Sequence, residues 1–199
     1  MLVKNINFVF NRAVKLILNS KTEWNSILTE TLTRRSVIKN YALPWMVIMV
    51  VCCFIGESLF ESRNIFSIQY VLTKGIIIFA VTYIGIYVSS LIINELTTSF
   101  NSKKDTEAVF KLVIYSCTGY FIASSLTLLL PPLPILMAFA LYSLYLFWEG
   151  STILLGTPDD NKVGFVVVSS LIMLGIYAIL SLIINNILHG IFGLNLLIQ

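Results

Sequence analysis

An uncharged run that proline interrupts, residues 112–148, most constrains the fold. It contains no charged residue and is too long for one membrane-spanning helix, which takes about 20 residues. Pro131, Pro132 and Pro134 divide the run, and proline cannot continue a helix interior. The run therefore predicts two membrane-spanning helices joined by a tight turn.

Further apolar runs bring the predicted number of spans to five. We place them at residues 41–59, 72–95, 109–130, 133–149 and 163–188. Hydrophobic residues make up 57% of the chain and charged residues only 12%, about half the charge of an ordinary soluble domain. This composition excludes a typical soluble enzyme, a nucleic-acid binder and a disordered protein. We expect an all-α polytopic membrane protein with an N-terminal segment, residues 1–40, and a five-helix transmembrane domain, residues 41–199.

Basic residues flank the predicted spans unevenly. Arg63 and Lys74 lie on one side, and the other 11 of the 13 Lys and Arg residues lie on the other, in the N-terminal segment and the even-numbered loops. Cytoplasmic loops of membrane proteins are enriched in Lys and Arg. The pattern therefore predicts a cytoplasmic N-terminus, and five spans then place the C-terminus outside.

The first 19 residues predict an amphipathic helix in the headgroup layer of the cytoplasmic leaflet. One stripe is apolar, with Ile6, Val9, Phe10, Ala13, Val14, Ile17 and Leu18 at helical spacing, and the other face is basic. The alternative is that the apolar stripe packs on the loops of the bundle itself. The predicted contacts with anionic lipid or a partner protein are Lys4, Arg12, Lys15, Trp24, Glu30, Arg34, Arg35 and Lys39.

The sequence offers no constellation typical of an active site. Three cysteines lie in apolar stretches without C-x-x-C spacing, and the single histidine, His189, lies near the end of span five. Neither a nucleophile elbow nor a nucleotide-binding glycine motif occurs. Asp159 and Asp160 follow Pro158 and are interpreted as a turn. We therefore expect no catalytic residue, no metal site and no cofactor.

Uncharged polar residues within the spans leave two interpretations open. One is an intramembrane polar cavity that accepts a lipid headgroup, as in a small transporter, channel or lipid carrier, lined by Tyr83, Tyr87, Tyr115, Ser116, Tyr142 and Tyr145. The other is hydrogen bonding between packed helices. Gly119 and Ala123 have the small-xxx-small spacing that permits close helix packing, within one bundle or in a homodimer.

Short motifs along nearly the whole chain carry a family resemblance. They include residues 16–24 with Ile27 and Glu30, 41–44 ending in Pro44, 94–96 with Glu95, 108–116 with Lys111, 131–134, and 141–145 followed by Gly150, Pro158 and Lys162. In these motifs the chain resembles the Yip family, the Ypt/Rab-interacting membrane proteins, and specifically its bacterial branch. The resemblance implies five membrane helices, a cytoplasmic N-terminus, residence in a bacterial inner membrane and a membrane-trafficking ancestry.

Two departures from the family pattern bear on partners. Gly119-Tyr120 matches the start of the family's Gly-Tyr-x-x-x-Pro motif, but Ser124 replaces its proline, and basic residues replace an acidic motif before span one. These departures argue against binding of small GTPases. We expect a non-enzymatic scaffolding, membrane-organising or lipid-interacting role. The competing idea of a lipid-modifying enzyme requires Glu95, Lys111 and Lys162 to converge at the cytoplasmic ends of the spans.

Overall fold

The computed structural model describes residues 2–60 and 68–192, and the side chains of residues 6–60 and 68–187. Lys4, Arg63 and His189 lie outside the residues whose side chains are described. Within the described ranges the chain is helical and has no strand, which confirms the all-α fold class. Five helical segments are long and apolar enough to cross a membrane: Arg34–Phe60, Ile68–Phe100, Thr106–Leu129, Pro134–Leu155 and Asp159–Ile187.

The first span begins earlier than the hydrophobic run predicted. It consists of α3 (Arg34–Val37), the π-helical turn η1 (Ile38–Ala42) and α4 (Leu43–Phe60). The Thr33 hydroxyl accepts a hydrogen bond from the backbone N–H of Ser36 and so caps the helix start. The wide turn of η1 precedes Pro44, the second residue of α4, which has no backbone N–H to donate to a helical hydrogen bond.

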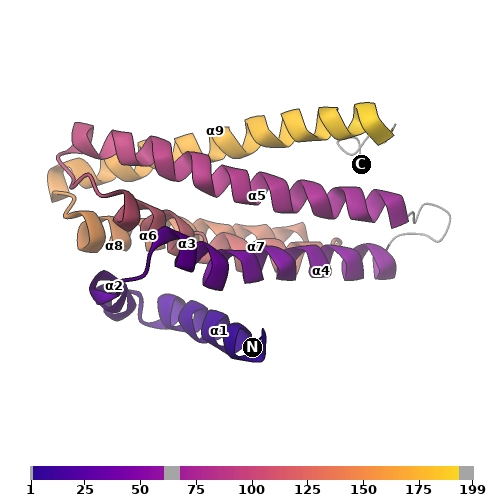
Figure 1. Ribbon diagram of the computed structural model, residues 1–199, viewed down its shortest axis with the longest axis horizontal. Helices are drawn as coiled ribbons and strands as arrows, with labels where there is room; N and C mark the ends of the chain where they lie inside the picture. The colour runs from indigo at the N-terminus through magenta and orange to yellow at the C-terminus, as the bar shows by residue number, and fades with distance from the viewer. Residues whose placement is uncertain (1, 61–67, 193–199) are drawn as a thin grey trace.

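The second and fifth spans lie side by side and form one layer of the bundle (Figure 1). They are α5 (Ile68–Leu96), continued by the 3-10 turn η2 (Thr97–Phe100), and α9 (Asp159–Phe192). The sequence predicted a separate turn at Asp159 and Asp160. In the structure both residues lie in the first turn of α9. Carboxylates are favourable there because the helix dipole is positive at its amino end.

The third span runs through the centre of the protein and is its most buried one. It is divided at Cys117 into α6 (Thr106–Ser116) and α7 (Thr118–Leu129). Every residue from Val109 to Ser116 is buried. The third span therefore supplies the surface on which the other elements pack.

The fourth span follows the predicted proline turn. It starts as the 3-10 helix η3 (Pro134–Leu141) and continues as α8 (Tyr142–Leu155). Gly119 of α7 lets this span approach closely, because a Cβ at position 119 would lie 2.8 Å from the backbone nitrogen of Ser143. The small-residue position predicted from sequence therefore serves packing inside the bundle.

The N-terminal segment forms two helices at one end of the bundle, α1 (Leu2–Leu18) and α2 (Ser20–Thr29). Figure 1 shows α1 running obliquely beside the first part of α4 and α2 lying next to α8. The ring centroids of Phe10 in α1 and Trp45 in α4 are 5.5 Å apart. We call this end the basic end, because it carries the exposed side chains of Lys15, Lys21, Arg34, Arg35, Lys39, Lys103 and Lys104.

Candidate functional sites

A buried charge cluster ties the two N-terminal helices together at the basic end. Arg12 of α1 is only 7% exposed, and its guanidinium lies 2.6 Å from Glu23 Oε1 and pairs with Glu30 as well. It also lies over the rings of Phe8 and Tyr115, 5.2 and 5.5 Å from the centroids. Burial alone would lower the pKa of Arg12, but the hydrogen bond to Glu30 and the nearby negative charges raise it above its usual value. Arg12 therefore stays charged inside the protein.

The helical face of α1 was predicted wrongly at this position. The sequence placed Arg12 among the lipid or partner contacts, whereas the structure buries it together with Val9, Ala13 and Leu16. The reason is that Glu23 of α2 and Glu30, which directly follows α2, compensate the buried positive charge of Arg12. Ile6, Phe10, Val14 and Leu18 of the predicted stripe are exposed instead.

Trp24 fixes α2 to the bundle, so its prediction as a surface contact is wrong. Its side chain is fully buried and meets the Tyr115 ring edge-on, with centroids 6.3 Å apart. The space for the indole exists because position 150 of α8 is glycine: a Cβ there would lie 2.7 Å from Trp24 Cζ2 and 2.6 Å from Leu112 Cδ1. A hydrogen bond from the Ser20 hydroxyl to Glu149 joins the same two helices.

The three residues required for a lipid-modifying site do not form one. Lys111 Nζ donates to the backbone oxygen of Glu30 at 2.5 Å. Glu95 pairs with Lys104, and the Lys162 ammonium lies 4.4 Å from the centre of the Trp148 ring. Each residue thus has a partner of its own, so the structure does not show the convergence that the competing idea of a lipid-modifying enzyme requires. Within the described side chains, no group of three or more His, Cys, Asp or Glu residues is arranged to hold a metal ion.

The predicted tyrosine cluster is also dispersed. Tyr83 is exposed and stacks on Phe79, and Tyr87 packs on Phe110. Tyr115 faces Arg12 at the basic end. Among the five predicted tyrosines, only Tyr142 and Tyr145 form an aromatic contact with each other. The Tyr142 hydroxyl also donates a hydrogen bond to the backbone oxygen of Ile17.

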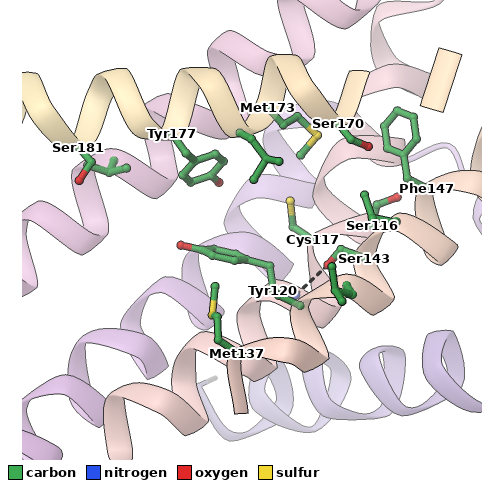
Figure 2. Close-up of a pocket in the computed structure, with 15 residues that line it drawn as sticks. Ser116, Cys117, Tyr120, Met137, Ser143, Phe147, Ser170, Met173, Tyr177 and Ser181 are labelled. Carbon is green, nitrogen blue, oxygen red and sulfur yellow. Dashed lines mark hydrogen bonds between the residues drawn. The ribbon is translucent and has the colours of Figure 1, made fainter. Parts of the chain in front are cut away.

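An intramembrane cavity is present, with largely different lining residues. Figure 2 shows it between α7, η3 and α8 on one side and α9 on the other. Its volume is about 470 Å³, and its walls are mainly apolar. Of the six predicted residues only Ser116 lines it; the other polar lining groups include Tyr120, Ser143, Ser170, Tyr177 and Ser181. Among the described side chains, the hydroxyls of Ser116 and Tyr177 find no hydrogen-bond partner.

A signal for this cavity existed in the sequence. Ser170, Tyr177 and Ser181 are spaced seven and four residues apart, so they share one face of α9. That face is directed toward Tyr120 across the cavity (Figure 2). The periodicity of polar residues within one span, rather than their number, would have identified it.

Comparison with known families decides the identity of the bundle. The model of the Yip1 domain matches residues 14–183, which include α2 and four complete spans together with most of the fifth. The chain belongs to the Yip family. Comparisons with curated proteins and with solved structures gave no match.

The Yip motif positions named from sequence lie near or at the basic end. Pro44 follows the π-turn of span one, Lys111 holds the end of the N-terminal segment, and Gly150 receives Trp24. Glu95 and Lys162 lie beside the connections at this end, where they pair with Lys104 and Trp148. Two of these positions in the Yip chain, Lys111 and Gly150, therefore contact the docked N-terminal segment.

Proposed function

We propose that this Yip protein is a non-enzymatic membrane-organising protein that binds the cytoplasmic leaflet of a bacterial inner membrane through its N-terminal helices. In this proposal the basic end faces the cytoplasm and the C-terminus lies outside. One side of α1, with Val9, Ala13 and Leu16, is buried against the rest of the protein. The observation that carries the proposal is a neighbouring side, the exposed flank, which is apolar and remains exposed.

The exposed flank of α1 has the chemistry of an interfacial helix. Phe10, Val14 and Leu18 are 46%, 51% and 72% exposed, and the exposed ammonium of Lys15 belongs to the same helix. Such a helix suits the boundary between acyl chains and headgroups. Its oblique position beside the start of α4 would place the flank at the depth of the leaflet (Figure 1). Each nearby Lys or Arg adds about 1 kcal/mol on an anionic surface.

Hydrogen exchange of the full chain in lipid nanodiscs tests the proposal. We expect the amides of α1 to exchange more slowly in bilayers with anionic lipid than in neutral bilayers. The Lys15→Glu variant should lose part of this protection, whereas Lys15→Arg keeps it because the charge is unchanged. Added salt should weaken the effect, since the Debye length is only about 10 Å at 0.1 M. Equal exchange of α1 in neutral and anionic bilayers would contradict the proposal.

A lipid carrier or small transporter is the second candidate function. It is favoured by the cavity of Figure 2, where the Ser116 and Tyr177 hydroxyls have no hydrogen-bond partner among the described residues. A structure in lipid nanodiscs tests it through non-protein density between α7 and α9. Density in contact with Tyr120 and Tyr177 would support a carrier, and an empty cavity would favour the membrane-organising role.

A further inference from the structure

A second cavity lies at the basic end, beneath the N-terminal helix. Its volume is about 620 Å³, and it is an open pocket bounded by α1, the connection from α2 to α3, the turn η1 and α6. Phe8, Thr29 and Thr31 are exposed around it, while Arg12, Tyr41 and Tyr115 are buried in its wall. Unlike the cavity of Figure 2, it contains charged groups.

Two polar atoms of this cavity lack a hydrogen-bond partner among the described side chains. One is the hydroxyl of Tyr115, whose side chain is 1% exposed, and the other is Oε2 of Glu30. Buried polar atoms in native proteins are nearly always satisfied by protein, water or ligand. The pair therefore points to an occupant that donates to a carboxylate oxygen and accepts from a hydroxyl.

The charges around the cavity favour an occupant that carries both signs. Arg12 is compensated by Glu23 and Glu30, and Lys111, which is 8% exposed, donates only to a backbone oxygen. These four side chains sum to zero formal charge. An anion alone would meet the two carboxylates, and a cation alone would meet Arg12 and Lys111. A zwitterion with an ammonium group beside Glu30 and an anionic group beside Tyr115 avoids both repulsions.

We propose that this cavity binds the headgroup of a phospholipid that carries a primary ammonium, such as phosphatidylethanolamine. The ammonium donates to Glu30 Oε2, and a phosphate oxygen accepts a hydrogen bond from the Tyr115 hydroxyl. A primary ammonium is specified because the free carboxylate oxygen needs an N–H donor, which a quaternary ammonium does not have. The exposed apolar side chains of α1, including Phe10 and Val14, offer a surface to the acyl chains. This inference rests on the lipid-interacting role proposed above and makes it specific.

The Tyr115→Phe variant tests the site without disturbing the fold. It removes one hydroxyl that has no partner in the described part of the chain, so the purified full chain should be at least as heat-stable as wild type in detergent. We expect phosphatidylethanolamine to raise the melting temperature of wild type more than phosphatidylcholine or phosphatidylglycerol does. Tyr115→Phe should bind phosphatidylethanolamine about 10-fold more weakly, because it loses a hydrogen bond to a charged group. Tyr83→Phe, at an exposed tyrosine of α5, is the matched control and should bind like wild type.

The outcomes separate this inference from the proposed function. Equal stabilisation of wild type by the three lipids, or full binding by Tyr115→Phe, would overturn the headgroup site. Glycerophosphoethanolamine, which has the headgroup but no acyl chains, should bind far more weakly; equal binding would assign the cavity to a soluble phosphoamine and overturn the lipid source. Binding of anionic leaflets through Lys15 can fail or succeed independently, because Lys15 does not line this cavity.

Discussion

Gly150→Ala should release the N-terminal segment from the bundle. The new methyl group would lie 2.7 Å from Trp24 Cζ2, 2.8 Å from Trp24 Cε2 and 2.6 Å from Leu112 Cδ1. All three contacts are closer than packed carbon atoms tolerate, about 3.5–4.0 Å. Trp24 and Leu112 are both fully buried, so neither side chain can move into open space. The least costly response is for α2 to move away from α8.

The size of the effect follows from two opposing terms. Inserting a methyl group into a packed core costs about 1–3 kcal/mol. Replacing glycine by alanine within a helix gains up to about 1 kcal/mol in helix propensity. Gly175→Ala in α9 isolates the second term, because a Cβ at position 175 meets no atom within 4 Å. We therefore expect Gly150→Ala to be less stable than Gly175→Ala by about 1–3 kcal/mol.

Limited trypsin digestion in detergent, read by mass spectrometry, measures the release of α2 directly. Lys21 is exposed on α2, but cleavage there requires the helix to open locally. At low protease concentration the cleavage rate follows the population of the open state. Gly150→Ala should accelerate cleavage at Lys21 about 5- to 150-fold relative to Gly175→Ala, the equivalent of 1–3 kcal/mol.

Equal cleavage rates and equal melting temperatures for the two variants would refute this reasoning. They would mean that Trp24 does not occupy the space above Gly150. Slower cleavage in Gly175→Ala than in wild type is compatible with the reasoning, because only the difference between the two alanine variants reports on the Trp24 contact.

Three further predictions concern charged groups at the basic end and the orientation of the bundle in the membrane. Arg12→Met should lower the melting temperature in detergent, because Glu23 and Glu30 lose their buried partner. Breaking a buried ion pair in this way costs about 3–5 kcal/mol in other proteins. Adding Glu23→Gln should recover part of the loss, and no recovery would argue against the pairing. Partial burial alone would raise the pKa of Asp105, but hydrogen bonds from the Ala108 N–H and Lys103 lower it below 3.8. The stabilisation by Asp105, about 1 kcal/mol as a helix cap, is therefore fully present above the unfolded pKa of 3.8 and is lost as the pH falls through the lower pKa of the folded state. The difference in melting temperature between wild type and Asp105→Ala should therefore stay constant near neutral pH and shrink as the pH falls below 3.8. In a cysteine-free background, an impermeant maleimide applied to intact cells should label Ser58→Cys and not Lys103→Cys; the reverse pattern would invert the proposed orientation.

The number of spans could be predicted from sequence, but several of their ends could not. Uncharged runs reveal the apolar core of each helix, since a charge within the bilayer is costly. The first helix nevertheless extends back to Arg34, through a stretch that includes Arg35, Lys39 and other polar residues. Composition does not detect this extension, because hydrogen bonding continues beyond the apolar part. The cap formed by Thr33 marks the true start.

The site residues were harder to predict because burial depends on distant partners. Arg12 is charged, so helical periodicity assigned it to the solvent side, yet Glu23 and Glu30 compensate it from 11 and 18 residues away. Trp24 looks like a surface anchor until Gly150 provides space for it. Likewise the predicted tyrosines are spread over three spans whose rotation about their own axes a single sequence does not specify.

The buried contacts and the proposed lipid contacts at the basic end are coupled. The cavity wall includes Arg12 and Phe8 of α1, so the complete cavity exists only while α1 is docked. A headgroup that binds only this state stabilises docking by RT ln(1 + [L]/Kd), about 2.7 kcal/mol when the lipid concentration is 100 times Kd. By the same linkage, a variant that weakens docking, such as Gly150→Ala, must weaken headgroup binding even though position 150 does not line the cavity. Tyr115→Phe should do the opposite, since it leaves docking intact and removes only the response to the lipid.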